Sequence, residues 1–96
     1  METREAELTI ELTGVRSSRE LHKHLMTALR FPDFYGQNWD AFWDAITGLI
    51  EMPLHLRLKG WPELVRLLPR DAEILRQSLT QAQAMYPSSA ATVTYD

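Results

Sequence analysis

The 96-residue chain contains no cysteine, which excludes disulfides and thiolate metal sites. It also has no long apolar run. The opening residues METREAE are charged rather than apolar, and no segment approaches the length of a signal-sequence core or a membrane span. We therefore expect a protein that stays in the reducing cytoplasm where it is made, with no membrane partner.

An excess of positive charge is missing as well. The sequence has 10 lysines and arginines against 13 aspartates and glutamates, for a formal net charge of −3. Nucleic-acid binding relies on a basic surface, so nucleic acid is not the expected partner. The sequence also lacks a glycine-rich phosphate loop, an H-E-x-x-H motif and a nucleophile elbow. These absences argue against an enzyme, and we expect neither a cofactor nor a metal.

Three short segments alternate apolar and polar residues, as half-buried strands do. They cover residues 8–12, 54–58 and 91–95, and two helical patterns separate each from the next. The order β-α-α-β-α-α-β, without a hairpin signal, favours a parallel sheet. Because one face of each strand is polar, the prediction for residues 1–96 is a single α/β domain. It has two layers, with a three-stranded parallel sheet covered on one face by about four helices.

Several residues predict where the helices begin and end. Ser17 with Glu20 has the spacing of a capping box, and Asp71 is a candidate N-cap of the last helix. Gly48 is placed to end the second helix, at about residues 39–47, in a left-handed conformation. Gly36, in the loop before that helix, permits a positive φ.

The histidines and one tryptophan are interpreted as structural. His22 and His24 are two residues apart on the first helix, so they point to different faces and cannot chelate one metal. We expect both on the surface, and His55 on the polar side of the middle strand. Trp61 is expected to anchor the core, because no basic groove accompanies it.

The most distinctive stretch is Phe31–Glu51, FPDFYGQNWDAFWDAITGLIE. It holds six of the nine aromatic residues and four acids, but no lysine or arginine. Asn38 is a good N-cap, and Asp40 in the following first turn is favoured by the helix dipole. Asp44 repeats the same charge four residues later, an arrangement that costs a few tenths of a kcal/mol in an isolated helix. Stability alone does not explain this second aspartate.

Large apolar side chains adjoin the two aspartates on the predicted helix. They are Trp39, Phe42, Trp43 and Ile46. Aromatic anchors beside mutually repelling charge indicate a surface for a cationic protein. A solvated acidic face on a core helix is the alternative. A third interpretation makes Asp40 and Asp44 a catalytic carboxylate pair, but a short helix in a small domain leaves little room for a cleft.

The segment PDFYGQNWDAFWDAITGLIE, followed by MPL, closely resembles the signature of the barstar family, intracellular inhibitors of secreted bacterial ribonucleases of the barnase type. The similarity is strong over residues 31–58 and collinear through both ends. It implies the same three-stranded parallel sheet covered by helices on one side. It also implies a monomer that binds a small basic extracellular ribonuclease one to one, through the second helix and the loop before it.

The resemblance also implies roles for individual residues. Asp44 is the central carboxylate, which occupies the enzyme's phosphate-binding site and contacts its arginines and catalytic histidine. Asp40 pairs with a further basic residue. The packed surround matches the family pattern at Gly36, Asn38, Trp43, Thr47 and Gly48.

Three contact positions depart from the pattern. Phe34 and Leu49 stand where the best-known member has a tyrosine and a tryptophan, and Gln81 stands where it has a glutamate. These differences leave a second possibility open, that the chain is an acidic interaction module of the same fold that regulates a different cationic protein.

Overall fold

The computed structural model of the chain describes residues 4–33 and 35–96. Phe34, one of the predicted contact residues, lies outside the described residues, and its role stays a prediction.

Three strands form one parallel sheet in the order β1-β2-β3. They are β1 (Glu7–Glu11), β2 (His55–Lys59) and β3 (Thr92–Tyr95). Leu56 in the middle strand pairs with Leu8 on one side and Val93 on the other. The predicted parallel sheet is confirmed.

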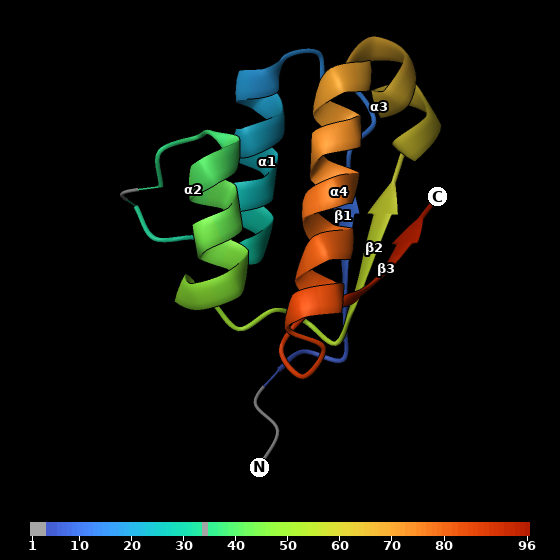
Figure 1. The fold of residues 1–96 in the computed structure, drawn as a ribbon. Coiled ribbons are helices and arrows are strands. Elements are labelled where there is room, and N and C mark those ends of the chain that lie inside the picture. The colour runs from blue at the N-terminus through green and yellow to red at the C-terminus, as the bar shows by residue number, and fades with distance from the viewer. Residues whose placement is uncertain (1–3, 34) are drawn as a thin grey trace.

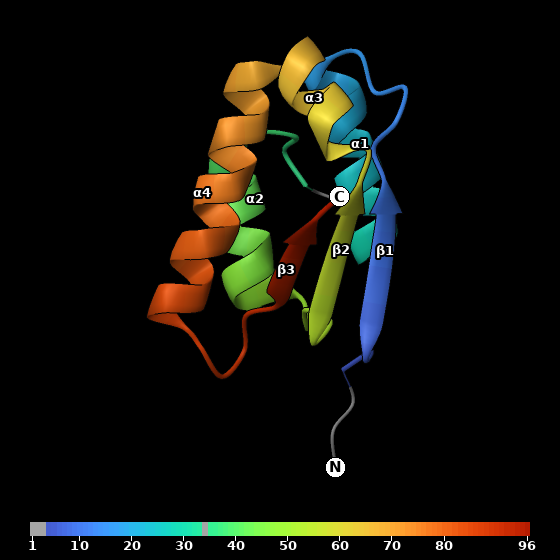
Figure 2. The ribbon, with the colours of Figure 1, turned by 90° about the vertical axis from the view of Figure 1, so that its right-hand side faces the viewer.

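All the helices of the described chain lie on one face of this sheet, as a comparison of Figure 1 and Figure 2 shows. They are α1 (Ser18–Leu29), α2 (Trp39–Asp44) with its π-helical continuation η1 (Ala45–Leu49), α3 (Trp61–Leu67) and α4 (Pro69–Met85). The other face of the sheet, turned toward the viewer in Figure 2, carries no helix. The predicted two-layer α/β architecture is therefore confirmed. Within the described residues, no helix is long and apolar enough to cross a membrane.

The core fills the space between the sheet and the helices. Ile10, Leu56 and Leu58 on the strands are almost completely buried, and so is Phe42 of α2. From α1 the core receives Leu21, Leu25 and Leu29, the stripe that the 3.6-residue period predicts. Burial of Phe42 at the centre of α2 holds this short helix against the rest of the molecule.

The start of α1 confirms Ser17 as the N-cap. Its hydroxyl accepts a hydrogen bond from the backbone N–H of Glu20 at 3.1 Å. The Glu20 carboxylate accepts a hydrogen bond from the backbone N–H of Arg16 at 3.2 Å. In a standard capping box this bond would come from the N–H of the N-cap itself, one residue later.

The predicted N-cap of the last helix is wrong. Helix α4 begins at Pro69 rather than after Asp71, and its N-cap is Leu68. A proline at the first helical position has a suitable φ and loses no hydrogen bond, because the first N–H groups of a helix have no intrahelical partner. Asp71 lies in the first turn, where its carboxylate is favoured by the helix dipole and is available for other contacts.

Candidate protein-binding site

The Asn38 side chain connects helix α2 with the loop before it through two hydrogen bonds. The Asn38 Oδ1 accepts the N–H of Ala41 at 2.8 Å, which confirms the predicted N-cap. The Nδ2 donates in the other direction, to the carbonyl of Gly36 at 3.2 Å. One side chain therefore fixes both the start of the helix and the path of the loop.

The positive φ expected at Gly36 falls on the next residue instead. Gln37 has φ 53°, whereas Gly36 does not adopt a left-handed conformation. Glycine at position 36 instead leaves room for a close contact, since a Cβ there would lie 3.0 Å from the Asn38 Nδ2 and would displace that side chain slightly. The close approach lets Asn38 reach back to the loop.

The loop is anchored to α1 by His22, which was predicted to be a surface residue. That prediction is wrong, because His22 is only 2% exposed. Its Nδ1 lies 2.5 Å from the hydroxyl of Tyr35, a buried loop residue, and its ring packs 4.4 Å from that of Trp39. The face of α1 next to its sheet-facing leucines is covered by α2 and the loop, which the period of a single helix cannot reveal. His24, by contrast, is exposed as predicted.

Burial lowers the pKa of His22, and the charge of Asp71 opposes this effect. Asp71 also accepts a hydrogen bond from the indole N–H of Trp39 at 3.0 Å. The first turn of α4 thereby supports the first turn of α2. His22, Tyr35 and Asp71 could not be predicted from the sequence as supporting residues, because no local pattern marks them.

The two aspartates of α2 project from this supported framework into solvent. Both Asp40 and Asp44 are exposed. Within the described part of the chain, neither side chain forms an ion pair or a hydrogen bond. Their mutual repulsion is therefore not relieved by a neighbouring cation.

The aromatic residues of α2 pack mainly inward. Phe42 is fully buried, and its ring lies 5.3 Å from that of Trp39. Trp43 is half-buried and packs against the core. The aromatic stripe is thus largely a core feature, and Trp43 is only partly exposed.

The left-handed cap predicted at Gly48 is also wrong. The helix continues through Gly48 as a wide turn, in which the N–H of Ile50 bonds to the carbonyl of Ala45 at 3.1 Å. The hydroxyl of Thr47 donates to the carbonyl of Trp43 at 2.6 Å, a bond that competes with the regular ladder. The chain then leaves in an extended conformation at Ile50, so no left-handed residue is required.

A hollow of about 160 Å³ separates the loop from the end of α2. It brings together three predicted contact residues, Gly36, Asp44 and Leu49. Leu49 is 52% exposed, so it is not part of the core. Gln81 is exposed on α4, which runs beside α2 in Figure 1, and its amide reaches the Met85 sulfur at 3.6 Å.

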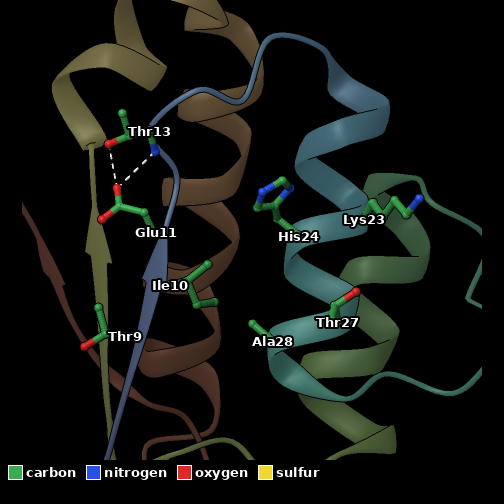
Figure 3. Close-up of a pocket in the computed structure, with 8 residues that line it drawn as sticks. All are labelled: Thr9, Ile10, Glu11, Thr13, Lys23, His24, Thr27 and Ala28. Atoms are coloured by element: carbon green, nitrogen blue, oxygen red, sulfur yellow. Dashed lines mark hydrogen bonds between the residues drawn. The ribbon is translucent and has the colours of Figure 1, made fainter.

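A larger hollow, of about 530 Å³, lies between β1 and α1. Figure 3 shows that its polar groups do not converge. Glu11 is occupied with the backbone and hydroxyl of Thr13. The His24 Nδ1 lies 2.9 Å from the Glu20 carbonyl of its own helix. Among the described residues there is also no group of three histidines or acids that could hold a metal ion. The acidic helix therefore remains the strongest candidate.

The chain is similar to known proteins over nearly its whole length. The profile of the family described as Barstar (barnase inhibitor) matches residues 5–95. The chain is also 40% identical over 63 residues to a protein of Bacillus subtilis (strain 168) named "Putative ribonuclease inhibitor YrdF", an overlap of 66% of this chain and 69% of the relative. The match extends across nearly the whole chain, including both layers of the fold and the acidic helix. This chain belongs to the barstar family.

Proposed function

We propose that this chain inhibits a small, basic, secreted bacterial ribonuclease by binding it one to one through α2 and the preceding loop. The family is described as inhibiting barnase, and the relative's name also refers to a ribonuclease inhibitor. The observation that carries the proposal is the pair of exposed aspartates, Asp40 and Asp44, with no cationic partner in the described part of the chain.

The proposed mechanism is charge mimicry. A ribonuclease binds a polyanion, so its active site presents arginine, lysine and histidine side chains. Two carboxylates on a rigid helix replace the phosphates while offering no bond that the enzyme can cleave. In this proposal Asp44 enters the phosphate-binding site, and Asp40 pairs with a second basic residue.

The support beneath α2 contributes to affinity by reducing the ordering cost of binding. Asn38 fixes the loop to the helix, and the contact of His22 with Tyr35 anchors the loop to α1. Around the two aspartates, the proposed surface comprises Phe34, Gly36, Asn38, Trp43, Thr47, Gly48, Leu49 and Gln81.

The proposal includes a cellular role. A cytoplasmic inhibitor of this kind, acting as a monomer without a cofactor, protects the producing cell from its own ribonuclease before export. It acts as a stoichiometric partner and not as an enzyme.

A second candidate, an acidic module that regulates a different cationic protein, is favoured by the surface around the hollow. Leu49 and Gln81 both depart from the best-known family member, and Leu49 is well exposed. These differences fit a changed partner as well as a changed ribonuclease.

The decisive experiment titrates the purified protein into RNA cleavage by a small secreted ribonuclease of the producing organism. Inhibition should be complete at one equivalent, and the double variant Asp40→Asn/Asp44→Asn should not inhibit. Loss of the endpoint at one equivalent would contradict the 1:1 complex. If the protein instead captures a cationic non-nuclease from the secretome and leaves RNA cleavage unchanged, the second candidate is correct.

A further inference from the structure

The open face of the sheet carries an acid, a histidine and a hydroxyl in contact, one from each strand. Glu7 lies on β1, His55 on β2 and Thr94 on β3. The Glu7 Oε2 is 2.9 Å from the His55 Nδ1, and the His55 Nε2 is 2.6 Å from the Thr94 Oγ1. Glu7 and His55 alternate with the more buried residues of β1 and β2, so they lie on the face turned toward the viewer in Figure 2, and the contact with His55 places the Thr94 hydroxyl on the same face.

The direction of the hydrogen bonds follows from the chemistry of the three groups. The hydrogen bond with His55 and the charge of Arg57 lower the pKa of Glu7, so its carboxylate is ionised at neutral pH. An ionised carboxylate only accepts hydrogen bonds, so the neutral imidazole carries its proton on Nδ1. The Nε2 is then an acceptor, and the Thr94 hydroxyl donates to it.

We propose that Thr94 is a nucleophilic modification site, acylated on its Oγ1 by activated acyl esters, with His55 as the general base and Glu7 as its orienting group. A nucleophile bonded to a base, which is in turn oriented by a third group, is the arrangement that activates hydroxyls in acyl transfer. The site is on the face of the sheet opposite the helices, so it is distinct from the acidic surface of α2.

The reaction balances with the ester alone. The Thr94 oxygen forms a bond to the ester carbonyl carbon while the His55 Nε2 takes the hydroxyl proton. The tetrahedral adduct then collapses, the bond to the leaving alkoxide breaks, and His55 returns the proton to that leaving group. The products are acyl-Thr94 and a free alcohol, with no oxidant or cofactor required.

A positive charge stands beside the hydroxyl. Arg57 pairs with Thr94 in the parallel register, and its side chain is partly exposed on the same face. Its Nε lies 3.4 Å from the Asp96 Oδ2 but has no hydrogen-bonding partner in the described chain. The Arg57 guanidinium is ion-paired with Asp96, so only the part of its charge that this carboxylate leaves uncompensated favours the oxyanion that develops on the adduct.

The test uses p-nitrophenyl acetate as the acyl donor and the complete chain as the acceptor. We expect release of one equivalent of nitrophenolate, a mass gain of one acetyl group, and the acetyl on Thr94 by peptide mapping. Thr94→Val should abolish the stable label, and Thr94→Ser should retain it. His55→Gln should slow acylation by about a hundredfold or more, the lower end of the range for general-base catalysis. Glu7→Gln, which removes the orienting charge, should slow it as well.

The matched control is His24→Gln, because the contact of the His24 ring, at Nδ1, is with the backbone carbonyl of Glu20. Its acylation should equal that of the unchanged protein. A label on a lysine or histidine instead of Thr94, or an equal stable label in Thr94→Val, would overturn the proposal. Since His55 links three strands, circular dichroism must confirm that its variant is folded. If it is not, Glu7→Gln decides the question, because Glu7 is half-exposed at the sheet edge.

Discussion

At the scale of single residues, Asp44 slightly destabilises its own helix by charge repulsion. Asp40 and Asp44 repel each other across one helical turn, at about 0.2–0.5 kcal/mol in an isolated helix. Asp40 is partly compensated by the dipole of the first turn, whereas Asp44 is a full turn further along. A partner that places cations against both carboxylates converts this cost into binding energy.

Asp44→Ala should therefore weaken ribonuclease binding more than any other single substitution. Removing the central carboxylate leaves the partner's cations desolvated and unpaired, so we expect a loss of about 2 kcal/mol or more. The complex of the family's namesake is itself the standard example of such hot spots and coupling, and its energies are not transferred to this chain. Calorimetry measures the change, and a loss below about 1 kcal/mol would mean that the main contact lies elsewhere.

Gln81→Glu tests whether the proposed ribonuclease partner has changed together with this chain. The substitution restores a carboxylate found in the best-known member, on the helix beside α2. If the partner no longer has a cation opposite this position, the new charge is uncompensated and binding should be unchanged or weaker, which is the result we expect. Association and dissociation rates should be measured with its own ribonuclease and with a barnase-like one. Tighter binding to its own enzyme would refute this expectation.

His22 should make the stability of the protein depend on pH in mildly acidic solution. Because burial depresses its pKa in the folded state, the unfolded chain binds a proton that the folded chain does not. Stability should therefore be complete above the ordinary histidine pKa of about 6.5 and decline as the pH falls below it toward the depressed value. Glu7 and Glu11, whose pKa values lie below 4.5, lose their contributions only at lower pH.

Urea unfolding at a series of pH values measures this effect. In His22→Gln the decline below about pH 6.5 should flatten, because the titrating group is gone. His24→Gln is the control, since this exposed residue should leave the profile unchanged. An unaltered slope in His22→Gln would assign the pH dependence to other groups.

At the scale of the elements, α2 is too short to be stable by itself and depends on its surroundings. Its loop is tied to α1 by His22 and Tyr35, and its first turn to α4 by Trp39 and Asp71. Its end is a π turn, a distortion that occurs frequently at functional sites. The element that carries the acids is therefore held at its start by two helices and ends in a widened turn beside the hollow.

Gly48→Ala discriminates between the π turn and the left-handed cap that the sequence predicted. A Cβ at Gly48 would meet nothing within 4 Å and its φ is not positive, so the stability should change by less than about 0.5 kcal/mol. The control is Gly60→Ala, where φ is +79° and a Cβ would lie 2.7 Å from the backbone N of Thr13. That substitution should destabilise by more than about 1 kcal/mol. A comparable loss at Gly48, measured by urea unfolding, would favour the left-handed cap.

The sequence was sufficient where a feature depends on neighbours along the chain. Alternation predicted the strands, and the N-caps at Ser17 and Asn38 follow from local hydrogen bonding. It was insufficient where the deciding contact comes from another element. His22 is buried because α2 and its loop cover α1, and Asp71 is used by Trp39 of a different helix.

The candidate surface likewise combines features that the sequence predicts with features that depend on contacts between elements. Its acids could be predicted from composition, and its individual roles only from the family resemblance. The hollow that joins Gly36, Asp44 and Leu49 depends on how the loop folds against α2. No spacing rule predicts from the sequence how closely the loop approaches the end of α2.

At the scale of the whole molecule, negative charge is concentrated in one segment of the chain. The net charge of the chain is −3, yet the stretch from Phe31 to Glu51 holds four acids and no lysine or arginine. The rest of the chain is therefore nearly neutral. Such a distribution orients the protein as it approaches a basic partner, which an even spread of the same net charge would not do.

Association with the ribonuclease should consequently be fast and sensitive to salt. The acidic stretch steers the encounter, and salt screens this steering because the Debye length is about 10 Å at 0.1 M. Stopped-flow association rates should fall steeply from low to high salt, and Asp40→Asn should lower both the rate and its salt dependence.

Glu5→Gln changes the net charge equally but lies outside the acidic stretch, so it should have little effect. Equal effects of the two variants would show that total charge, and not its position on α2, governs association. A rate that does not change with salt would rule out steering by charge while leaving the complex itself intact.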